Sequence, residues 1–192
     1  KYELIRKIAS GGMAEVFLAR QSGEIGGFSK TVAIKRIFAH VADEPDAKNM
    51  VFDEARIAAN FNHPNIVQVY ELGEEGEHLY IAMEYVHGRD LKRIIEAGLE
   101  QENLLSINMA VSIVAQAAAG LGYAHRQTDE DGKPMNVIHR DVSPQNVLVS
   151  AEGHVKLCDF GIAKAEDRLG HTKEGQFKGK VSYMSPEQFD TT

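Results

Sequence analysis

The sequence is short of cysteine and of positive charge. Cys158 is the only cysteine among 192 residues, which excludes an internal disulfide and fits a reducing compartment such as the cytoplasm. Lysine and arginine number 21 against 28 acidic residues, for a formal net charge of -7. This balance argues against a nucleic-acid-binding protein. With 43% hydrophobic and 26% charged residues, the composition is that of an ordinary soluble domain.

Long apolar runs without charge are also scarce, and internal repeats and low-complexity tracts are absent. One segment, Ile107 to Ala124, carries no formal charge and is long enough to be tested as a membrane span. Polar residues recur in it at every fourth position, and apolar residues occupy the opposite side of the helix. This periodicity predicts a core helix of a soluble protein rather than a membrane segment. The polar stripe is Asn108, Ser112 and Gln116, and the apolar face is Ile107, Val111, Val114, Ala118 and Leu121.

The most informative stretch reads IHRDVSPQNVLVSAEGHVKLCDFG, from Ile138 to Gly161. Residues 147–150 and 154–157 are predicted to be the strands of a hairpin, with its turn at 151–153. Such a hairpin brings Asn146 and Asp159 to one end. Oxygen ligands there suit Mg²⁺ when phosphate supplies further ligands. Asp141, just upstream, is placed to face a nucleophile.

His139, Arg140 and Asp141, followed after four residues by Asn146, resemble the catalytic loop of protein kinases, and Asp159-Phe160-Gly161 resembles their metal-binding triplet. The resemblance covers Tyr2 to Glu187 and points to the bacterial serine/threonine kinases of eukaryotic type. It implies an α+β, two-lobed fold. Residues 1–85 would form a β-rich N-lobe with a five-stranded sheet and one helix, and residues 86–192 a mainly helical C-lobe.

The length supports a further expectation. A kinase domain usually needs roughly 250 residues or more, and this chain of 192 residues opens at Lys1 without methionine. We therefore expect a chain cut at both ends, with its C-lobe truncated after the activation segment. No signal peptide precedes Tyr2, so we expect a cytoplasmic protein, or the cytoplasmic part of a membrane-anchored kinase.

The first candidate for nucleotide binding is the predicted hairpin of residues 2–10 and 13–20, whose turn holds Gly11 and Gly12. Glycine lets backbone N–H groups approach phosphate oxygens. The turn resembles the kinase glycine-rich loop, with Ala9 and Ala14 where the outer glycines belong, while a plain hairpin remains the alternative. The residues assigned to this loop by resemblance are Ile8, Ala9, Ser10, Gly11, Gly12, Met13, Ala14, Glu15 and Val16.

A lysine in a strand rich in β-branched residues supplies the next candidate. Lys35 ends the sequence Val-Ala-Ile-Lys, and a lysine buried there needs a negative partner. The predicted helix of residues 46–60 directs Glu54 inward, at the position of the family's lysine-binding glutamate. Without these motifs, Lys35 would be interpreted as a solvated strand lysine.

Two further predicted strands, residues 66–72 and 78–83, lead to a segment that resembles the hinge between the lobes. The resemblance implies that the backbone of Glu84 and Val86 binds adenine and that Met83 lies at the back of its pocket. Apolar residues would enclose the adenine ring; they are Ile8, Val16, Ala33 and Leu148. Beyond the hinge, Asp90 and Ser106 are predicted to cap helices that begin at residues 91 and 107.

Together these motifs predict a serine/threonine protein kinase that uses ATP and Mg²⁺. Lys35 and Glu54 would clamp phosphates, Asn146 and Asp159 would hold Mg²⁺, and Asp141 would orient the acceptor hydroxyl. Protein substrates are the expected partners, and neither nucleic acid nor a membrane segment is expected. Residues 128–135, which read TDEDGKPM, are predicted to be an exposed loop that either docks a partner or is only a solvated insertion.

Two departures from the family pattern bear on activity. Ser143 stands where serine/threonine kinases usually carry lysine, and Lys180 stands where they usually carry threonine. We hypothesise that the two are exchanged, so that Lys180 supplies the ammonium beside Asp141 and Ser143 the hydroxyl. Two independent losses are the alternative. A pseudokinase that binds nucleotide without transfer is the second functional hypothesis. A small-molecule kinase is disfavoured, and so is a tyrosine kinase because Pro144 follows Ser143.

Regulation is less clearly encoded. Arg140 beside Asp141 indicates a basic pocket for a phosphorylated activation segment, and Thr172 is the candidate for self-phosphorylation. Ordering without phosphate is the alternative. Cys158 precedes the metal aspartate and is interpreted as a small packed residue, with a redox-sensing thiol as the other reading.

Overall fold

The computed structural model describes residues 1–192 except 24–26, 44, 77, 130, 161–180 and 186–192, and it leaves out the side chains of 46, 47, 50, 53, 54 and 181. The chain divides into two compact units. The first consists of Lys1–Phe61 and Gln68–Tyr85, and the second of Asn62–Val67 and Val86–Thr192. The second unit therefore takes in a short segment from the middle of the first.

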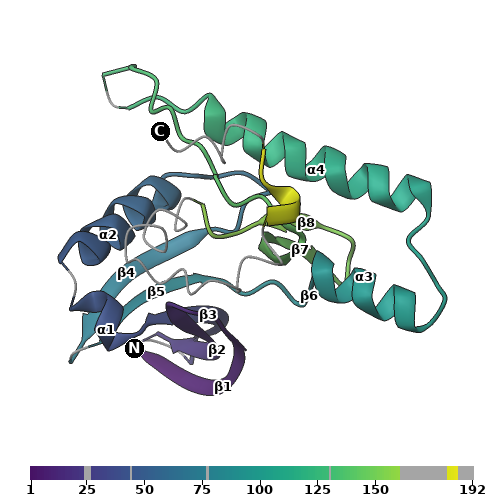
Figure 1. The fold of residues 1–192 in the computed structure, drawn as a ribbon. Coiled ribbons are helices and arrows are strands. Elements are labelled where there is room, and N and C mark those ends of the chain that lie inside the picture. The colour runs from purple at the N-terminus through teal and green to yellow at the C-terminus, as the bar shows by residue number, and fades with distance from the viewer. Residues whose placement is uncertain (24–26, 44, 77, 130, 161–180, 186–192) are drawn as a thin grey trace. The chain divides into compact units, whose positions relative to one another are not determined.

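The first unit is built on a five-stranded antiparallel sheet, with the order β1-β2-β3-β5-β4 (Figure 1). Two helices accompany it, and α2 packs against β4. The predicted hairpin and the helix of residues 46–60 are confirmed, whereas the strand expected from residue 66 begins at Val69. The elements are β1 (Tyr2–Ser10), β2 (Ala14–Ser22), β3 (Ser29–Ile37), α1 (Ala39–Ala42), α2 (Pro45–Ala59), β4 (Val69–Glu75) and β5 (His78–Glu84).

The two faces of this sheet have different chemistry. One face carries a small core of Ala19, Val32, Ile34 and Ala82, against which aromatic rings pack. Gly73 makes room for one of these rings, because a Cβ there would lie 2.4 Å from Cζ of Tyr80. Residues opposite one another in neighbouring strands share a face. The other face therefore carries the row Ala9, Val16, Lys35 and Ile81, whose members are cross-strand partners.

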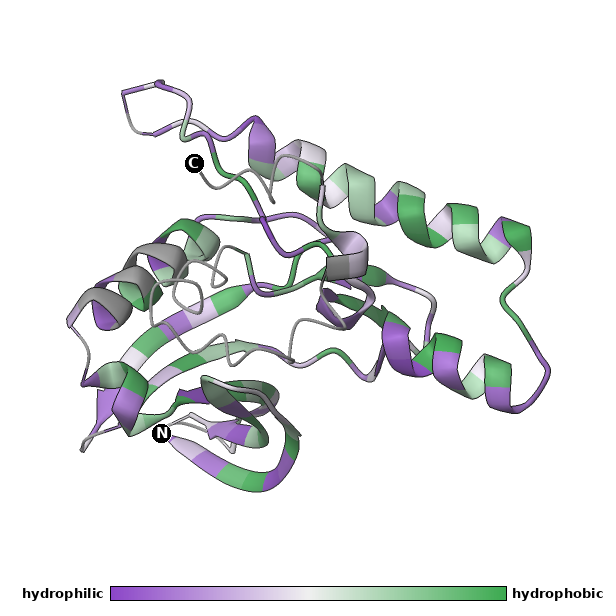
Figure 2. Ribbon diagram, viewed as in Figure 1, coloured by the Kyte–Doolittle hydropathy of each residue, from purple (hydrophilic) through white to green (hydrophobic). Residues whose placement is uncertain are grey.

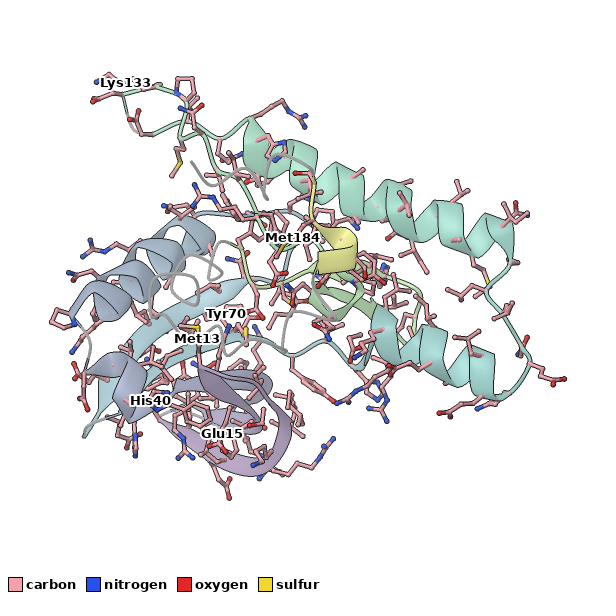
Figure 3. All side chains as sticks on the ribbon, viewed as in Figure 1. Met13, Glu15, His40, Tyr70, Lys133 and Met184 are labelled. Carbon is pink, nitrogen blue, oxygen red and sulfur yellow. The ribbon has the colours of Figure 1, made fainter. Side chains whose placement is uncertain are left out.

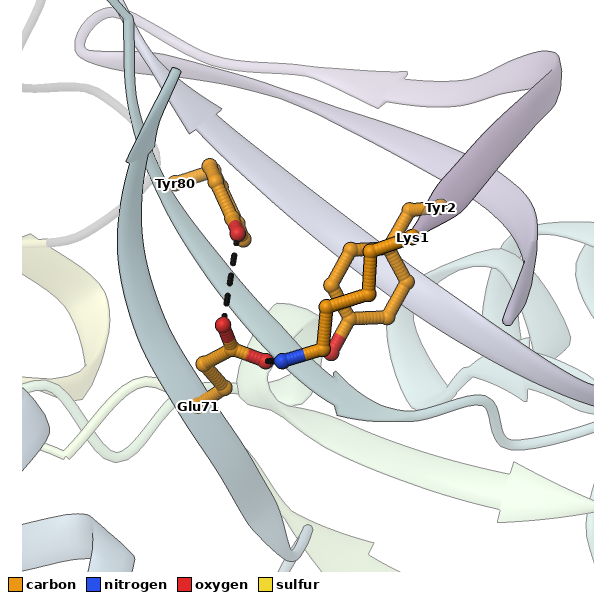
Figure 4. A network of polar contacts seen from close by, with 4 residues as sticks. All are labelled: Lys1, Tyr2, Glu71 and Tyr80. Atoms are coloured by element: carbon orange, nitrogen blue, oxygen red, sulfur yellow. Dashed lines mark hydrogen bonds and ion pairs between the residues drawn. The ribbon is translucent and has the colours of Figure 1, made fainter. Parts of the chain in front are cut away.

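A polar cluster links the two edge strands of the sheet (Figure 4). Glu71 of β4 accepts hydrogen bonds from Tyr2 Oη (2.7 Å) and Tyr80 Oη (3.4 Å) and pairs with the ammonium of Lys1. The rings of Tyr2 and Tyr80 also meet edge to face, with centroids 5.8 Å apart. Since β1 and β4 share no backbone ladder, these side chains hold the two edges together.

Among its described residues, the second unit combines a three-stranded sheet, of order β6-β7-β8, with two α-helices and two short 3-10 helices. Both predicted caps are confirmed, since Asp90 accepts a hydrogen bond from the backbone N–H of Arg93 (3.0 Å) and Ser106 from that of Met109 (3.3 Å). The elements are β6 (Gly88–Asp90), α3 (Leu91–Glu100), α4 (Ile107–His125), η1 (Pro144–Asn146), β7 (Val147–Ser150), β8 (Val155–Leu157) and η2 (Val181–Tyr183).

The buried side of α4 differs from the prediction. Figure 2 shows apolar residues along its whole length, and the expected core face is exposed at Val111 (62%) and Val114 (66%). The helix instead buries Ile113, Gly120 and Ala124 and packs on β8, where Gly120 lies against Leu157. Within the polar stripe, Gln116 points inward. Its Oε1 accepts hydrogen bonds from the backbone N–H of Val155 (3.2 Å) and from the side-chain amide of Asn65 (3.3 Å). A strand edge with an unpaired N–H needs an acceptor, and Gln116 supplies it.

Length and composition make α4 the one helix in the described part of the chain that could cross a membrane, and 17% of its most apolar 18-residue window is buried within the structure. The segment that packs beside it is Asn62–Val67, which the sequence pattern had assigned partly to a strand. Asn65 donates to the carbonyl of Val155 (2.9 Å), and the backbone N–H of Val67 donates to Leu157 (2.8 Å). These bonds tie residues 62–67 to β8 and explain why β4 starts late.

Candidate active site

The hairpin of β7 and β8 forms as predicted and joins two of the candidate site residues. Gly153 turns with φ 86°, and Ser150 Oγ accepts from the backbone N–H groups of Glu152 and His154 (both 3.2 Å). At the other end, the Cys158 N–H donates to the carbonyl of Asn146 (3.0 Å). Asn146 and Asp159 therefore lie at the same end of the hairpin.

Asn146 also fixes Asp141. Its amide nitrogen donates to the backbone carbonyl of Asp141 (2.8 Å) and to that residue's Oδ2 (2.9 Å). Because the nitrogen is committed to Asp141, the amide oxygen of Asn146 is the atom that remains for a cation. The backbone of Asp159 adopts the left-handed region at φ 58°, an uncommon conformation for a non-glycine residue that often marks functional sites.

The donor set fits Mg²⁺ held jointly with phosphate. Among the residues that the structure describes, no group of three His, Cys, Asp or Glu side chains could hold a metal ion alone. Asn146 and Asp159 carry two hard oxygen ligands at the same end of the hairpin. Mg²⁺ usually takes one or two protein carboxylates and completes its shell with phosphate and water.

His139 is a buried residue that supports Asp141 and the segment before Asp159. The sequence had identified it only as part of a motif. It is 1% exposed. Its Nε2 donates to the carbonyl of Cys158 (3.1 Å), its Nδ1 accepts from the backbone N–H of Asp141 (3.4 Å), and its ring lies 4.5 Å from that of Phe160. Burial lowers the pKa of His139, and the carbonyl of Cys158 and the carboxylates of Asp159 and Asp141 only partly oppose this. The neutral imidazole thus links two segments of the chain, one that carries Asp141 and one that carries Asp159.

Ser143 is buried at 5% exposure, and its hydroxyl has no hydrogen-bond partner among the described residues. Lys180 and Thr172 lie outside the described residues, so the exchange of Ser143 and Lys180 and the phosphorylation of Thr172 stay predictions. Arg140 is exposed and has a left-handed backbone, at φ 65°.

In the first unit, Lys35 is 8% exposed on β3. It shares its face with residues predicted to contact the nucleotide, since Val16 is its cross-strand partner and Ala33, two residues away, pairs with Met83. Glu54 belongs to α2 in the same unit, but its side chain lies outside the description. The ion pair between Lys35 and Glu54 therefore stays a prediction.

The predicted nucleotide loop is a tight turn. The N–H of Gly11 donates to the carbonyl of Ala14 (2.9 Å), and Met13 is buried. Glu15 turns to the other face of the sheet, where it pairs with Arg36 (2.7 Å) and Lys7 (3.1 Å), and these hydrogen bonds lower its pKa. Figure 3 labels Met13 and Glu15. Glu15 therefore braces three strands, and its side chain is occupied away from the row of Lys35.

At the end of β5, the N–H of Glu84 donates to the carbonyl of Gln68 (2.8 Å), and Gln68 N–H donates back to Glu84 Oε2 (3.2 Å). An adenine contact at Glu84 would therefore use its carbonyl. Val86 and Leu148 belong to the second unit, where Leu148 of β7 lies opposite Lys156.

Comparison with known proteins accounts for these features. A family model described as the protein kinase domain matches residues 2–192. The chain belongs to the protein kinase family. The kinase fold is also found in solved structures: the kinase domain of Mycobacterium tuberculosis PknI is 30% identical, with a TM-score of 0.67 over 84% of this chain and 60% of that one.

Curated relatives are bacterial kinases of both acceptor types. The kinase domain is 46% identical to the tyrosine-protein kinase MasK of Myxococcus xanthus over 97% of the chain and 29% of that protein. It is 36% identical to the serine/threonine-protein kinase PrkC of Bacillus subtilis over 98% of the chain and 26% of that protein. The chain thus spans about a quarter to a third of the length of such relatives.

Sequence reasoning missed the supporting roles of His139, Asn65 and Gln116. His139 had a signal, because it opens the catalytic-loop motif. Asn65 and Gln116 had none, because their role depends on a strand edge that is remote in sequence and visible only once α4 and β8 are side by side.

Proposed function

We propose that this kinase domain transfers the terminal phosphoryl group of ATP to a hydroxyl of a protein substrate, with serine and threonine as the principal acceptors. The observation that carries the proposal is the pair of hydrogen bonds from Asn146 to Asp141, beside Asp159 at the end of a hairpin. Several serine/threonine-protein kinases among the relatives support the choice of acceptor.

Each residue has a distinct part in this proposal. Asn146 holds the Asp141 carboxylate, which accepts a hydrogen bond from the acceptor hydroxyl and orients its attack. Asn146 Oδ1 and Asp159 provide the magnesium ligands, and bound Mg²⁺ neutralises phosphate charge. Lys35, paired with Glu54, adds a second fixed cation. Preorganised charges of this kind contribute most of the rate enhancement in phosphoryl transfer.

Nucleotide binding is assigned to backbone and apolar groups of the chain. The turn of Gly11 and Gly12 is assigned to the phosphates. The adenine is assigned to the backbone of Glu84 and Val86. The apolar surfaces around it are Ile8, Val16, Ala33, Met83 and Leu148.

The test is radiolabel transfer from ATP and Mg²⁺ to casein by the purified full-length protein, followed by phosphoamino acid analysis. We expect phosphoserine and phosphothreonine, and no label with Asp141→Asn. Saturable ATP binding without any transfer by the wild type would instead support the pseudokinase.

Tyrosine is the second candidate acceptor, because the relative at 46% identity is named a tyrosine-protein kinase. Ser143 is relevant here, since its short side chain stands where the serine/threonine kinases usually carry lysine. Phosphotyrosine in the same analysis, at a level comparable with phosphoserine, would assign a dual specificity.

The exchange of Ser143 and Lys180 has its own test. The single variants Ser143→Lys and Lys180→Thr should each lower kcat, and the double variant should recover much of the loss. Strictly additive losses would show that the two positions do not act together.

Mapping of phosphopeptides after incubation with ATP would test self-phosphorylation of Thr172. An enzyme that is active but unmodified would exclude Thr172 as a required phosphorylation site. Cytoplasmic placement also stays a prediction.

A further inference from the structure

A cavity of about 410 Å³ lies in the second unit between α3 and the beginning of α4, the two helices at the right of Figure 1. Its size is within the usual range for ligand pockets. None of the candidate catalytic or metal-binding residues lines it. Its main lining side chains are Arg89, Arg93, Ile94, Leu104, Leu105 and Met109.

The backbone holds the wall of this pocket in place. The N–H of Asn103 donates to the carbonyl of Gly98 (2.8 Å), and that of Gln101 donates to Ala97 (3.1 Å). A Cβ on Gly98 would lie 2.8 Å from the carbonyl oxygen of Asn103, so only glycine permits this approach. Glu102 reverses the chain at φ 52°. The pocket is therefore formed before any ligand binds, which limits the ordering that binding would require.

The pocket is apolar inside and cationic at one side. Arg93 pairs with Asp90 at 3.3 Å, and its side chain is 56% exposed. The backbone of Arg89 pairs with Val149 of β7, and its guanidinium has no hydrogen bond or ion pair with any described residue, so it is available to an anion. A chain with a net charge of -7 here presents two arginines beside apolar side chains. This combination favours a ligand that is both acidic and apolar.

The exposed surface indicates how large the ligand is. Leu104 and Met109 line the pocket yet remain 66% and 54% exposed. A small molecule confined to the cavity would leave this apolar surface in water, whereas an extended peptide would cover it. The arginines stand at β6 and in the first turn of α3, so carboxylates flanking an apolar residue of a peptide could meet them.

We propose that this pocket docks an acidic segment of a partner protein, with a leucine-sized side chain in the cavity and neighbouring carboxylates on Arg89 and Arg93. The site is separate from the candidate active site and does not depend on phosphoryl transfer. Its occupation would hold a partner to the second unit by a surface other than the catalytic loop.

Fluorescence anisotropy without ATP tests the proposal. The probes are fluorescein-labelled Asp-Glu-Glu-Leu-Leu-Glu-Asp, the same peptide with serine for leucine, and the same peptide with lysine at every acidic position. We expect saturable binding of the first peptide alone. Arg89→Glu should weaken it roughly tenfold, and Leu104→Ser should weaken it by a similar factor without unfolding the protein, since that side chain is mostly exposed.

Lys92→Glu is the matched control, because Lys92 lies on the same helix, pairs with Glu96 (3.6 Å) and does not line the pocket. It should leave binding unchanged. Arg89→Glu should also bind the lysine peptide better than the wild type does. Equal binding of the acidic and basic leucine peptides, no binding of either, or binding only to phosphatidylglycerol vesicles would overturn the proposal. Because no ATP is present, none of these outcomes reflects on the kinase activity.

Discussion

Two carboxylates, one in each unit, are held in contrasting ways. Glu71 is held by donors from Lys1, from Tyr2 of β1 and from Tyr80 of β5, up to 70 residues away in sequence. Asp141 is held by Asn146, five residues along the same loop. A carboxylate bonded by distant strands stabilises the fold that brings them together. A carboxylate bonded within its own loop is oriented with little effect on the fold, and such a group is suited to meet a substrate.

Replacement of Asp141 provides the largest expected effect. Asp141→Asn keeps the size of the side chain but removes the acceptor for the substrate hydroxyl, so kcat should fall by roughly 10²- to 10⁴-fold. The thermal midpoint should change little, because the hydrogen bonds of Asp141 to Asn146 and His139 lie within one loop. Steady-state assays and thermal melts measure both quantities. Asp131→Asn, in the exposed loop, is the control and should change neither. A large loss of stability in Asp141→Asn would remove the contrast with Glu71.

Gln116 shows that a polar group of the second unit can also be structural. Gln116→Leu preserves volume but leaves the N–H of Val155 without its acceptor and removes one of the two acceptors of the Asn65 amide, at a cost of about 1–3 kcal/mol in the free energy of unfolding. Urea denaturation measures this. Asn108→Ala, two turns earlier on the same helix and exposed, should stay within about 0.5 kcal/mol. Equal effects of the two variants would mean that Gln116 does not seal the strand edge.

The same residues show where sequence reasoning succeeds. The β7–β8 hairpin and both helix caps were predictable because their signals are local: turn residues, alternation and capping side chains. The buried side of α4 was not, because apolar residues surround most of this helix and its orientation depends on Gln116 meeting a distant strand. The spacing of apolar residues in α4 alone favours the side of Val111 and Val114, and tertiary hydrogen bonding favours the opposite side.

Acid titration should separate the two regions. Burial lowers the pKa of His139 in the folded protein. Below about pH 6.5 the unfolded chain therefore binds a proton that the folded chain does not, and the protein becomes less stable as the pH is lowered. For Glu71, burial raises the pKa, but the hydrogen bonds from Lys1 and Tyr2 outweigh it and lower the pKa overall. The stability that Glu71 contributes is therefore present above about pH 4.5, the ordinary pKa of a glutamate, and is lost as the pH falls below that value.

Thermal midpoints measured from pH 8 to pH 4 test this order. His139→Gln should flatten the profile near pH 6.5, whereas His154→Gln, at an exposed position, should leave it unchanged. A decline that begins only near pH 4.5 in the wild type would show that protonation of His139 does not limit stability.

Glu71→Gln is expected to have the smallest effect, although Glu71 has more donors than Asp141. The amide still accepts a hydrogen bond from Tyr2 but loses the charge that pairs with Lys1, whose side chain is 55% exposed. Solvent screens such a pair, so the loss should be about 1 kcal/mol or less. Tyr2→Phe, which removes one hydrogen bond and keeps the ring contact with Tyr80, should cost a similar amount. Neither change should alter kcat, because the cluster lies on the sheet face opposite the row of Lys35. A fall in kcat without a fall in the thermal midpoint would contradict a purely structural role for Glu71 and would give it a part in placing the nucleotide turn.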